Sequence, residues 1–166
     1  MILCCSILWI LNNSKHLNIG RIAHDFASTL SALGCNITAV AASHSNDRTM
    51  ATSRAKNFAI RYAISNYYGS YNELAMDPNV DIVYVATTNQ NHMGPTLMML
   101  RAGKNVLVEK PTTITHEETR LMYDEAEVCY MLLYALNWFT YTYSLMIFPY
   151  LVSIEKRIVL DDQSLD

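Results

Sequence analysis

The chain has 166 residues, of which 51% are hydrophobic and 16% charged, and its formal net charge is −3. This length suits a single domain with a real core, and so apolar a composition excludes a disordered or collagen-like chain. The sequence has neither a basic balance nor a run of lysines and arginines, so nucleic-acid binding is disfavoured.

The cysteines have neither the paired spacing of metal ligands nor the density of a secreted disulfide scaffold. They are Cys4, Cys5, Cys35 and Cys129. We therefore expect reduced thiols, no metal site and a cytoplasmic location.

Two apolar stretches raise the question of a membrane. Residues Met1–Leu11 could be a signal peptide, but they lack a basic start and a small-residue cleavage pattern. The stretch Val128–Val152 carries no charge and is long enough to span a bilayer, but Asn137 dilutes it and Pro149 would break a helix. We expect neither secretion nor a membrane span, although a membrane-attached protein remains an alternative that predicts dependence on detergent.

The first predicted helix carries apolar residues at three- and four-residue spacing and ends at Gly34, where a left-handed residue is common. These residues are Ile22, Phe26, Leu30 and Leu33. The apolar run Ile37–Ala42 is typical of a strand covered on both faces. A second helix should follow the polar loop Ser43–Thr52. Its apolar face would be Ala55, Phe58, Ala59 and Tyr62.

Ser70 and Glu73 form a capping-box pattern for a short third helix. The β-branched run Val80–Ala86 is the strongest strand signal in the chain, and the polar turn Thr87–Asn91 follows it.

The next helix contains Leu97, Met98 and Leu100 and should end at Gly103. A buried strand is predicted at Asn105–Val108. Thr115 and Glu118 should cap a helix that runs to about Glu127, and Cys129–Leu136 completes the series.

Strands and helices thus alternate with short connections, which predicts an α/β fold: a Rossmann-like, doubly wound parallel sheet. Ligands of such sheets bind outside the carboxyl ends of the strands, so the loops that begin at Ser43, Thr87 and Glu109 should line one site. We divide the chain into a divergent N-terminus (1–17), a nucleotide-binding domain (18–140) and a helix start with an acidic tail (141–166).

The first helix opens with a partial dinucleotide-binding motif, Asn18-Ile19-Gly20-Arg21-Ile22-Ala23. The backbone of Gly20, Arg21 and Ile22 could bind a pyrophosphate at the helix N-terminus, where free amides and the helix dipole favour anions. Asn18 replaces the first glycine of the motif, so an ordinary loop that enters a helix remains an alternative.

The strand that should precede this turn is poor. Residues Asn13–Leu17 are polar, and the apolar run Ile7–Leu11 lies several residues too early. The first strand is therefore displaced or damaged, and its loss would expose apolar edges on both neighbouring strands.

The loop after the second strand bears on cofactor choice. It places no acid at the strand tip, where Ser43 stands, and it offers Arg48 to a 2′-phosphate. We expect NADP as the cofactor, with NAD possible. The alternative is that Arg48 is an ordinary solvated residue.

Two segments resemble the Gfo/Idh/MocA family of oxidoreductases. Thr87–His92 resembles the loop after the fourth strand, and Gly103–Pro111 resembles the Gly-Lys-x-Val-Leu-x-Glu-Lys-Pro signature. Tyr68–Asp81 looks most like NADP-dependent members that act on dihydrodiols or D-xylose. The likeness covers roughly Gly20–Leu151.

The resemblance implies a role for each matching residue. Lys110 would be catalytic, beside the nicotinamide and the substrate hydroxyl, and Glu109 would hold that lysine or the nicotinamide ribose. Thr87, Asn89 and His92 would contact the cofactor. Without the resemblance, Glu109 and Lys110 would be read as an exposed turn pair.

The sequence also departs from the family. Members carry a second acid/base residue on a C-terminal α/β domain that also forms the dimer interface, and we expect this sequence to end before that domain. The segment Leu132–Phe139 lacks the family's acidic and arginine positions. Two hypotheses follow: an oxidoreductase that moves hydride between NADP and a sugar or dihydrodiol hydroxyl, or a non-catalytic truncated remnant with weak or no dinucleotide binding.

Overall fold

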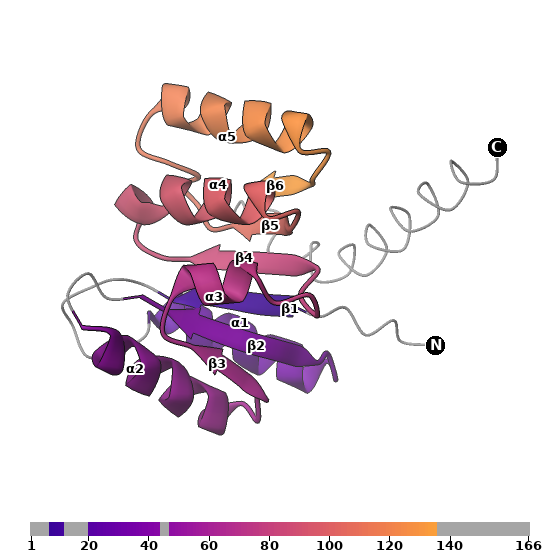
Figure 1. Ribbon diagram of the computed structural model, residues 1–166. Coiled ribbons are helices and arrows are strands. Elements are labelled where there is room, and N and C mark those ends of the chain that lie inside the picture. Colours follow the sequence, from indigo (N-terminus) through magenta and orange to yellow (C-terminus); the bar gives the residue numbers. More distant parts are fainter. Residues whose placement is uncertain (1–6, 12–19, 44–46, 136–166) are drawn as a thin grey trace.

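The computed structural model describes residues 7–11, 20–43 and 47–135, and these form a six-stranded parallel sheet (Figure 1). The spatial order is β3-β2-β1-β4-β5-β6, so the strand order reverses beside β1. The strands are β1 (Ile7–Leu11), β2 (Ile37–Ala42), β3 (Asn66–Tyr68), β4 (Ile82–Ala86), β5 (Asn105–Val108) and β6 (Leu133–Ala135). A ligand site is expected at such a reversal, because the connections on either side leave in opposite directions.

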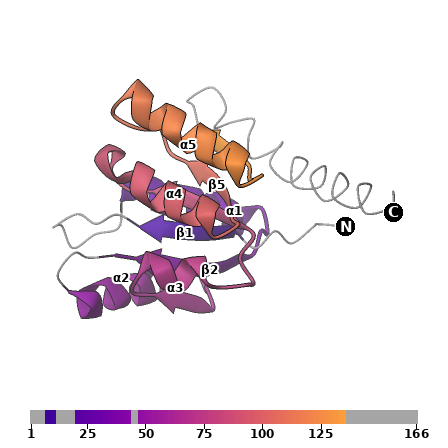
Figure 2. The ribbon, with the colours of Figure 1, turned by 45° about the horizontal axis from the view of Figure 1, so that its top comes forward.

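Helices cover both faces of the sheet (Figures 1 and 2). One face packs against α1 (Arg21–Ala32) and α2 (Arg48–Arg61). The other packs against α3 (Tyr71–Ala75), α4 (Met93–Arg101) and α5 (His116–Val128). A short 3-10 turn, η1 (Asn89–Asn91), precedes α4. The predicted doubly wound α/β fold is confirmed.

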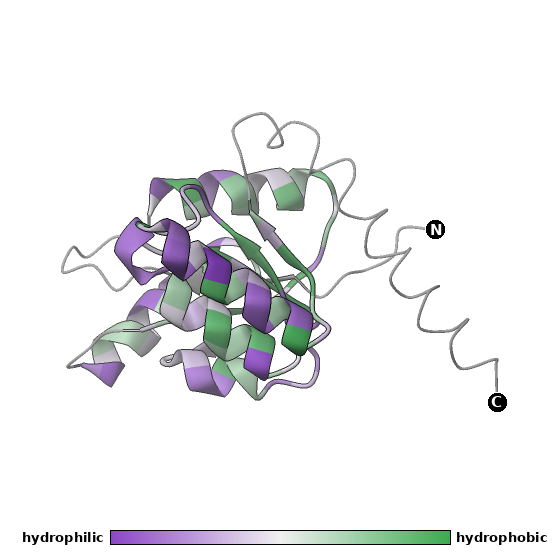
Figure 3. Cartoon of the chain, turned by 90° about the horizontal axis from the view of Figure 1, so that it is seen from above, coloured by the Kyte–Doolittle hydropathy of each residue, from purple (hydrophilic) through white to green (hydrophobic). Residues whose placement is uncertain are grey.

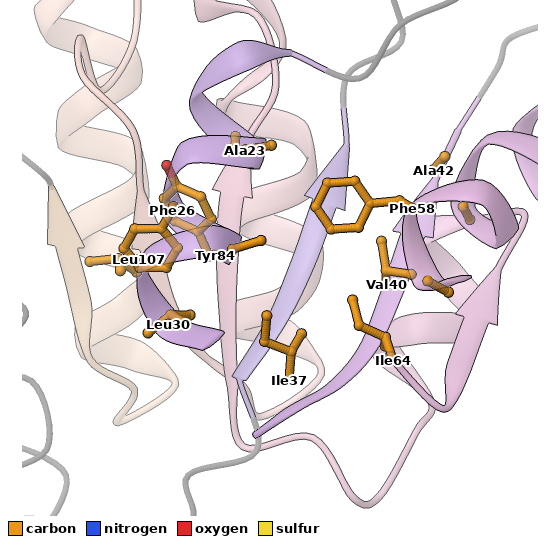
Figure 4. Close-up of a cluster of buried hydrophobic side chains, with 14 of the residues drawn as sticks. Ala23, Phe26, Leu30, Ile37, Val40, Ala42, Phe58, Ile64, Tyr84 and Leu107 are labelled. Atoms are coloured by element: carbon orange, nitrogen blue, oxygen red, sulfur yellow. The ribbon is translucent and has the colours of Figure 1, made fainter. Parts of the chain in front are cut away.

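The core lies on both sides of β4, all five residues of which are buried. Tyr84 faces the α1 side, where it packs with Phe26 and Leu107 (Figure 4). Val83 and Val85 belong to the core cluster on the other side. Apolar and polar residues alternate around the helices (Figure 3). Each helix therefore buries one side against the sheet.

The central position of the sheet is occupied by β1, which pairs with β2 from Ile7 to Leu11 and with β4 over the same residues. Of the two predicted alternatives, a displaced or a damaged first strand, the structure shows the displaced strand. Because β1 is present and pairs with both neighbours, the apolar edges that its loss would expose are covered. Residues 12–19, which link β1 to α1, lie outside the described residues.

Several local predictions are confirmed. Gly34 and Gly103 follow helices with φ of 71° and 72°, the left-handed conformation that glycine adopts without strain. The Ser70 hydroxyl accepts a hydrogen bond from the Glu73 amide, and Thr115 with Glu118 forms a complete capping box.

The second helix differs from its prediction because it begins at Arg48, so Arg48–Thr52 is helical rather than loop. The cause is Asp47, whose carboxylate accepts a hydrogen bond of 2.9 Å from the Met50 amide and so caps the helix. The three-residue strand β3 was not predicted, because so short a segment has no measurable periodicity.

No helix within residues 7–11, 20–43 and 47–135 is long and apolar enough to cross a membrane. Of the stretch Val128–Val152, the structure describes only the first eight residues, which include the end of α5 and strand β6. The rest of that stretch lies outside the described residues, as does the segment 141–166.

Candidate dinucleotide site at the carboxyl-end edge of the sheet

The N-terminus of α1 lies at the edge where the strands end. α1 runs antiparallel to the strands: Ala32 leads into the start of β2 at Ile37. Its first residue therefore lies at the opposite, carboxyl-end edge. Figure 4 shows this arrangement, with Ala23 at one end of the cluster and Leu30 near Ile37 at the other.

The backbone at the start of α1 is suited to an anion. Gly20 is the N-cap, and its carbonyl accepts a hydrogen bond of 3.0 Å from the Ala23 amide. The amides of Arg21 and Ile22 precede the first intrahelical bonds, so they point out of the helix end with the positive end of its dipole.

The side chains at this helix start face outward. Arg21 is 94% exposed, and its guanidinium lies 3.6 Å from the Asp25 carboxylate. Ile22 and Leu33, predicted on the apolar face, are exposed, and Ala23 and Ala27 are buried in their place. The face was misplaced because the small alanines allow α1 to approach the sheet closely.

The loops after β4 and β5 are neighbours at the same edge. The Glu109 amide donates to the Val85 carbonyl at 3.0 Å and so extends the pairing of the two strands by one bond. Thr87 is half-buried, and Asn89 and Lys110 are exposed. Lys110 thus lies at the carboxyl-end edge of the sheet, and β4 separates the strand that precedes it from β1.

His92 joins these two loops from inside. Its ring is fully buried, with Nδ1 2.8 Å from the Pro111 carbonyl and 3.2 Å from that of Thr112. Nε2 lies 3.2 Å from the Thr87 carbonyl. Both ring nitrogens face backbone carbonyls, so His92 connects the loop after β4 with the loop after β5. The Lys110–Pro111 peptide bond, which precedes the Pro111 and Thr112 carbonyls, is cis.

Glu109 points inward. The residue is 6% exposed, and its carboxylate accepts hydrogen bonds from the Tyr84 hydroxyl and, at 3.1 Å, from the backbone amide of Lys110. The Tyr84 contact was not predicted, although one hydroxyl in an otherwise aliphatic strand is the signal that could have revealed it.

The loop after β2 is described only at its two ends, because residues 44–46 lie outside the described residues. Ser43 follows β2 directly and is half-buried, whereas the Arg48 guanidinium is 71% exposed and pairs with the Glu73 carboxylate of α3. The Ser70 hydroxyl donates to the other Glu73 oxygen at 3.1 Å. Arg48 is therefore directed toward α3 in this structure.

The N-terminus of α1 lies at the strand ends beside the reversal of strand order, and His92 connects two loops at adjacent strand ends. This arrangement defines a dinucleotide-binding domain of the doubly wound class. The sequence profile of the Gfo/Idh/MocA oxidoreductases, with an NAD-binding Rossmann fold, matches residues 18–131. The chain belongs to this family.

Among curated proteins, the chain is similar to trans-1,2-dihydrobenzene-1,2-diol dehydrogenases. It is 42% identical to the mouse protein over 113 residues, and 40% identical to the human protein over 110 residues. Each match covers 66% of this chain and 32% of the relative. The chain thus matches about a third of the length of these dehydrogenases.

Solved structures show the same fold. A dehydrogenase from Thermotoga maritima superposes with a TM-score of 0.63 at 22% identity, covering 78% of this chain and 35% of that one. A 3-ketoreductase from Actinomadura kijaniata, solved with NADP, gives a TM-score of 0.62 at 25% identity, covering 79% of this chain and 37% of that one.

Proposed function

We propose that this chain is the dinucleotide-binding part of a dehydrogenase that moves hydride between NADP and a secondary hydroxyl of a sugar or trans-dihydrodiol. The observation that carries this proposal is the shared edge of the sheet: α1, whose N-terminus lies at that edge, packs over β4, and the Lys110 loop follows β5, the neighbour of β4. Family membership and the names of the relatives support it.

In this proposal the amides of Arg21 and Ile22, next to Gly20, bind the pyrophosphate. Ser43 and Arg48 would lie on the side of the adenosine ribose, and Arg48 would bind the 2′-phosphate of NADP. NAD remains possible, because the pairing of Arg48 with Glu73 competes with that phosphate. Thr87 and Asn89 would contact the cofactor from the neighbouring loop.

Lys110 is the proposed catalytic residue. Its exposed ammonium would orient the substrate hydroxyl and stabilise negative charge on the oxygen as the carbonyl forms. The chemistry that a bound nicotinamide supplies is acceptance of the hydride at C4. Glu109 holds the backbone of Lys110 in place, and His92 holds the loop that follows.

Titration of the chain with NADPH, monitored by the fluorescence of the NADPH, tests whether the chain binds the cofactor. We expect saturable binding by the 166-residue chain. Absence of saturation up to millimolar NADPH would favour the second candidate, a remnant without dinucleotide binding. That candidate gains support from the Arg48 pairing with Glu73 and from Asn18, which stands at the first glycine position of the motif.

Turnover is a separate question. The matched segment covers about a third of the curated dehydrogenases, and hydride transfer requires donor and acceptor to be held at near-attack distance. We expect negligible NADPH formation from NADP with D-xylose or a trans-dihydrodiol. Measurable formation by the purified chain would show that these residues suffice for catalysis.

A further inference from the structure

Tyr84 and Glu109 form a buried polar contact that the proposed roles do not yet use. Tyr84 is fully buried in the middle of β4, and Glu109 is 6% exposed at the end of β5. The Tyr84 hydroxyl donates to Glu109 Oε1. A carboxylate in such a place is costly unless hydrogen-bond donors compensate for the lost water, so this hydroxyl has a strong influence on where the carboxylate lies.

The Tyr84 ring cannot readily turn away from this contact. It stacks on Phe26 of α1, with ring centroids 4.2 Å apart and an angle of 23° between the planes (Figure 4). Phe26 is itself 2% exposed, and both rings belong to the same core cluster. The hydroxyl is therefore fixed by packing between the sheet and α1.

The second oxygen of Glu109 connects this buried contact to the backbone of the exposed Lys110. Glu109 Oε2 accepts the backbone amide of Lys110 at 3.1 Å. The conformation of the Glu109 side chain thus sets the direction in which the Lys110 backbone leaves β5. The backbone position of the exposed Lys110 therefore depends on the hydroxyl of the buried Tyr84.

We propose that Tyr84 is a positioning residue for Lys110: its hydroxyl holds the Glu109 carboxylate where that carboxylate fixes the Lys110 amide. The consequence for cofactor binding rests on the proposed function, whereas the consequence for the Lys110 backbone does not. Without the hydroxyl, the carboxylate turns toward solvent, and Lys110 loses both its hydrogen bond and its fixed direction.

The test compares Tyr84→Phe with Tyr68→Phe. Tyr68 makes an equivalent contact elsewhere, because its hydroxyl donates to the Asp77 carboxylate at 2.9 Å. For each full-length variant, hydrogen exchange of the Lys110 amide and the Kd of NADPH are measured. We expect Tyr84→Phe to raise the exchange rate at least tenfold and the Kd about tenfold, while Tyr68→Phe changes both less than twofold.

Unchanged exchange at Lys110 in folded Tyr84→Phe overturns the proposal. If Tyr84→Phe does not fold, Glu109→Leu replaces it: leucine has no side-chain oxygen and cannot accept the Lys110 amide in any rotamer. Faster exchange is then expected, and unchanged exchange again overturns the proposal. Failure of the unaltered chain to bind NADPH would overturn the proposed function alone, because the exchange measurement needs no cofactor.

Discussion

Arg48 stands in the first turn of α2, and Glu73 holds its guanidinium. A 2′-phosphate that binds Arg48 has to compete with this carboxylate for the same donors. Both side chains are partly exposed, so the ion pair is weakened by solvent and by salt, and a doubly charged phosphate can displace it. The preference for NADP over NAD therefore depends on the balance between two anions at one arginine.

We expect Arg48→Gln to lower the ratio of NADPH affinity to NADH affinity about tenfold, because one charge-assisted hydrogen bond to phosphate contributes about 1.4 kcal/mol. Glu73→Gln should raise the same ratio, because it frees the guanidinium. Arg101→Gln is the matched control, since Arg101 pairs with Glu125 on the α4–α5 side. An unchanged ratio in Arg48→Gln would remove Arg48 from the site.

At the scale of elements, α1 and α2 meet through an aromatic contact around His24. Its ring lies 4.9 Å from that of Phe58, and its Nδ1 lies 2.9 Å from the Tyr62 hydroxyl. Burial, and to a smaller extent the charge of Arg61, lower the pKa of His24 below its ordinary value of 6.5. The contact between the two helices therefore favours the neutral imidazole.

This shift makes the stability of the α1–α2 contact depend on pH. The unfolded chain binds a proton at His24 more readily than the folded chain, so the stabilisation is fully present above pH 6.5 and is lost as the pH falls below that value toward the folded pKa. We expect the free energy of unfolding, measured with urea, to decrease from pH 7.5 to pH 5.5, and His24→Gln to flatten this decrease.

His116→Gln is the matched control for His24→Gln, because His116 is exposed at the start of α5. It should leave the slope unchanged. An identical pH dependence in His24→Gln and the unaltered chain would mean that other groups are responsible.

Most elements could be predicted from the sequence because their signals are local. The apolar runs of β2, β4 and β5 and the caps at Ser70 and Thr115 lie within a few residues of the structure that they determine. The start of α2 was misplaced because Asp47 caps it from within a segment that resembles a polar loop. The short strand β3 pairs with β2, a contact between segments distant in the sequence that local patterns do not report.

The site was less predictable, because its contacts join residues distant in the sequence. Glu109 and Lys110 could be identified through the family signature, but the contact of Glu109 with Tyr84 spans 25 residues. Likewise the His92 ring contacts a carbonyl in the loop after β5, and Arg48 of α2 pairs with the Glu73 carboxylate of α3. Such pairings depend on how β4, β5 and the helices come together, which periodicity does not report.

At the scale of the whole molecule, β1 connects the two halves of the sheet. It pairs with β2 on one side and with β4 on the other, so the α2–β3 half and the α4–α5 half share this strand. A central strand cannot be removed without exposing the backbone and apolar surface of both neighbours. Residues Ile7–Leu11 are therefore required for one cooperative unit.

Two truncations test this requirement. Removal of residues 1–11 should abolish the cooperative unfolding transition seen by circular dichroism and cause aggregation on gel filtration. Removal of residues 1–6 alone, which keeps β1, is the matched control and should preserve the transition. A chain without residues 1–11 that unfolds as cooperatively as the full chain would show that another segment can fill the central position.

In the proposed function, the α1 N-terminus and the Lys110 loop bind one dinucleotide together. Titration of the ¹⁵N-labelled chain with NADPH, followed residue by residue in amide NMR spectra, tests it directly. We expect the amide signals of Arg21, Ile22 and Lys110 to shift along one saturation curve, while the signals of Gly34 and Lys104 at the opposite edge do not shift. Saturable shifts at Gly34 and Lys104, with none at Arg21 or Lys110, would contradict it.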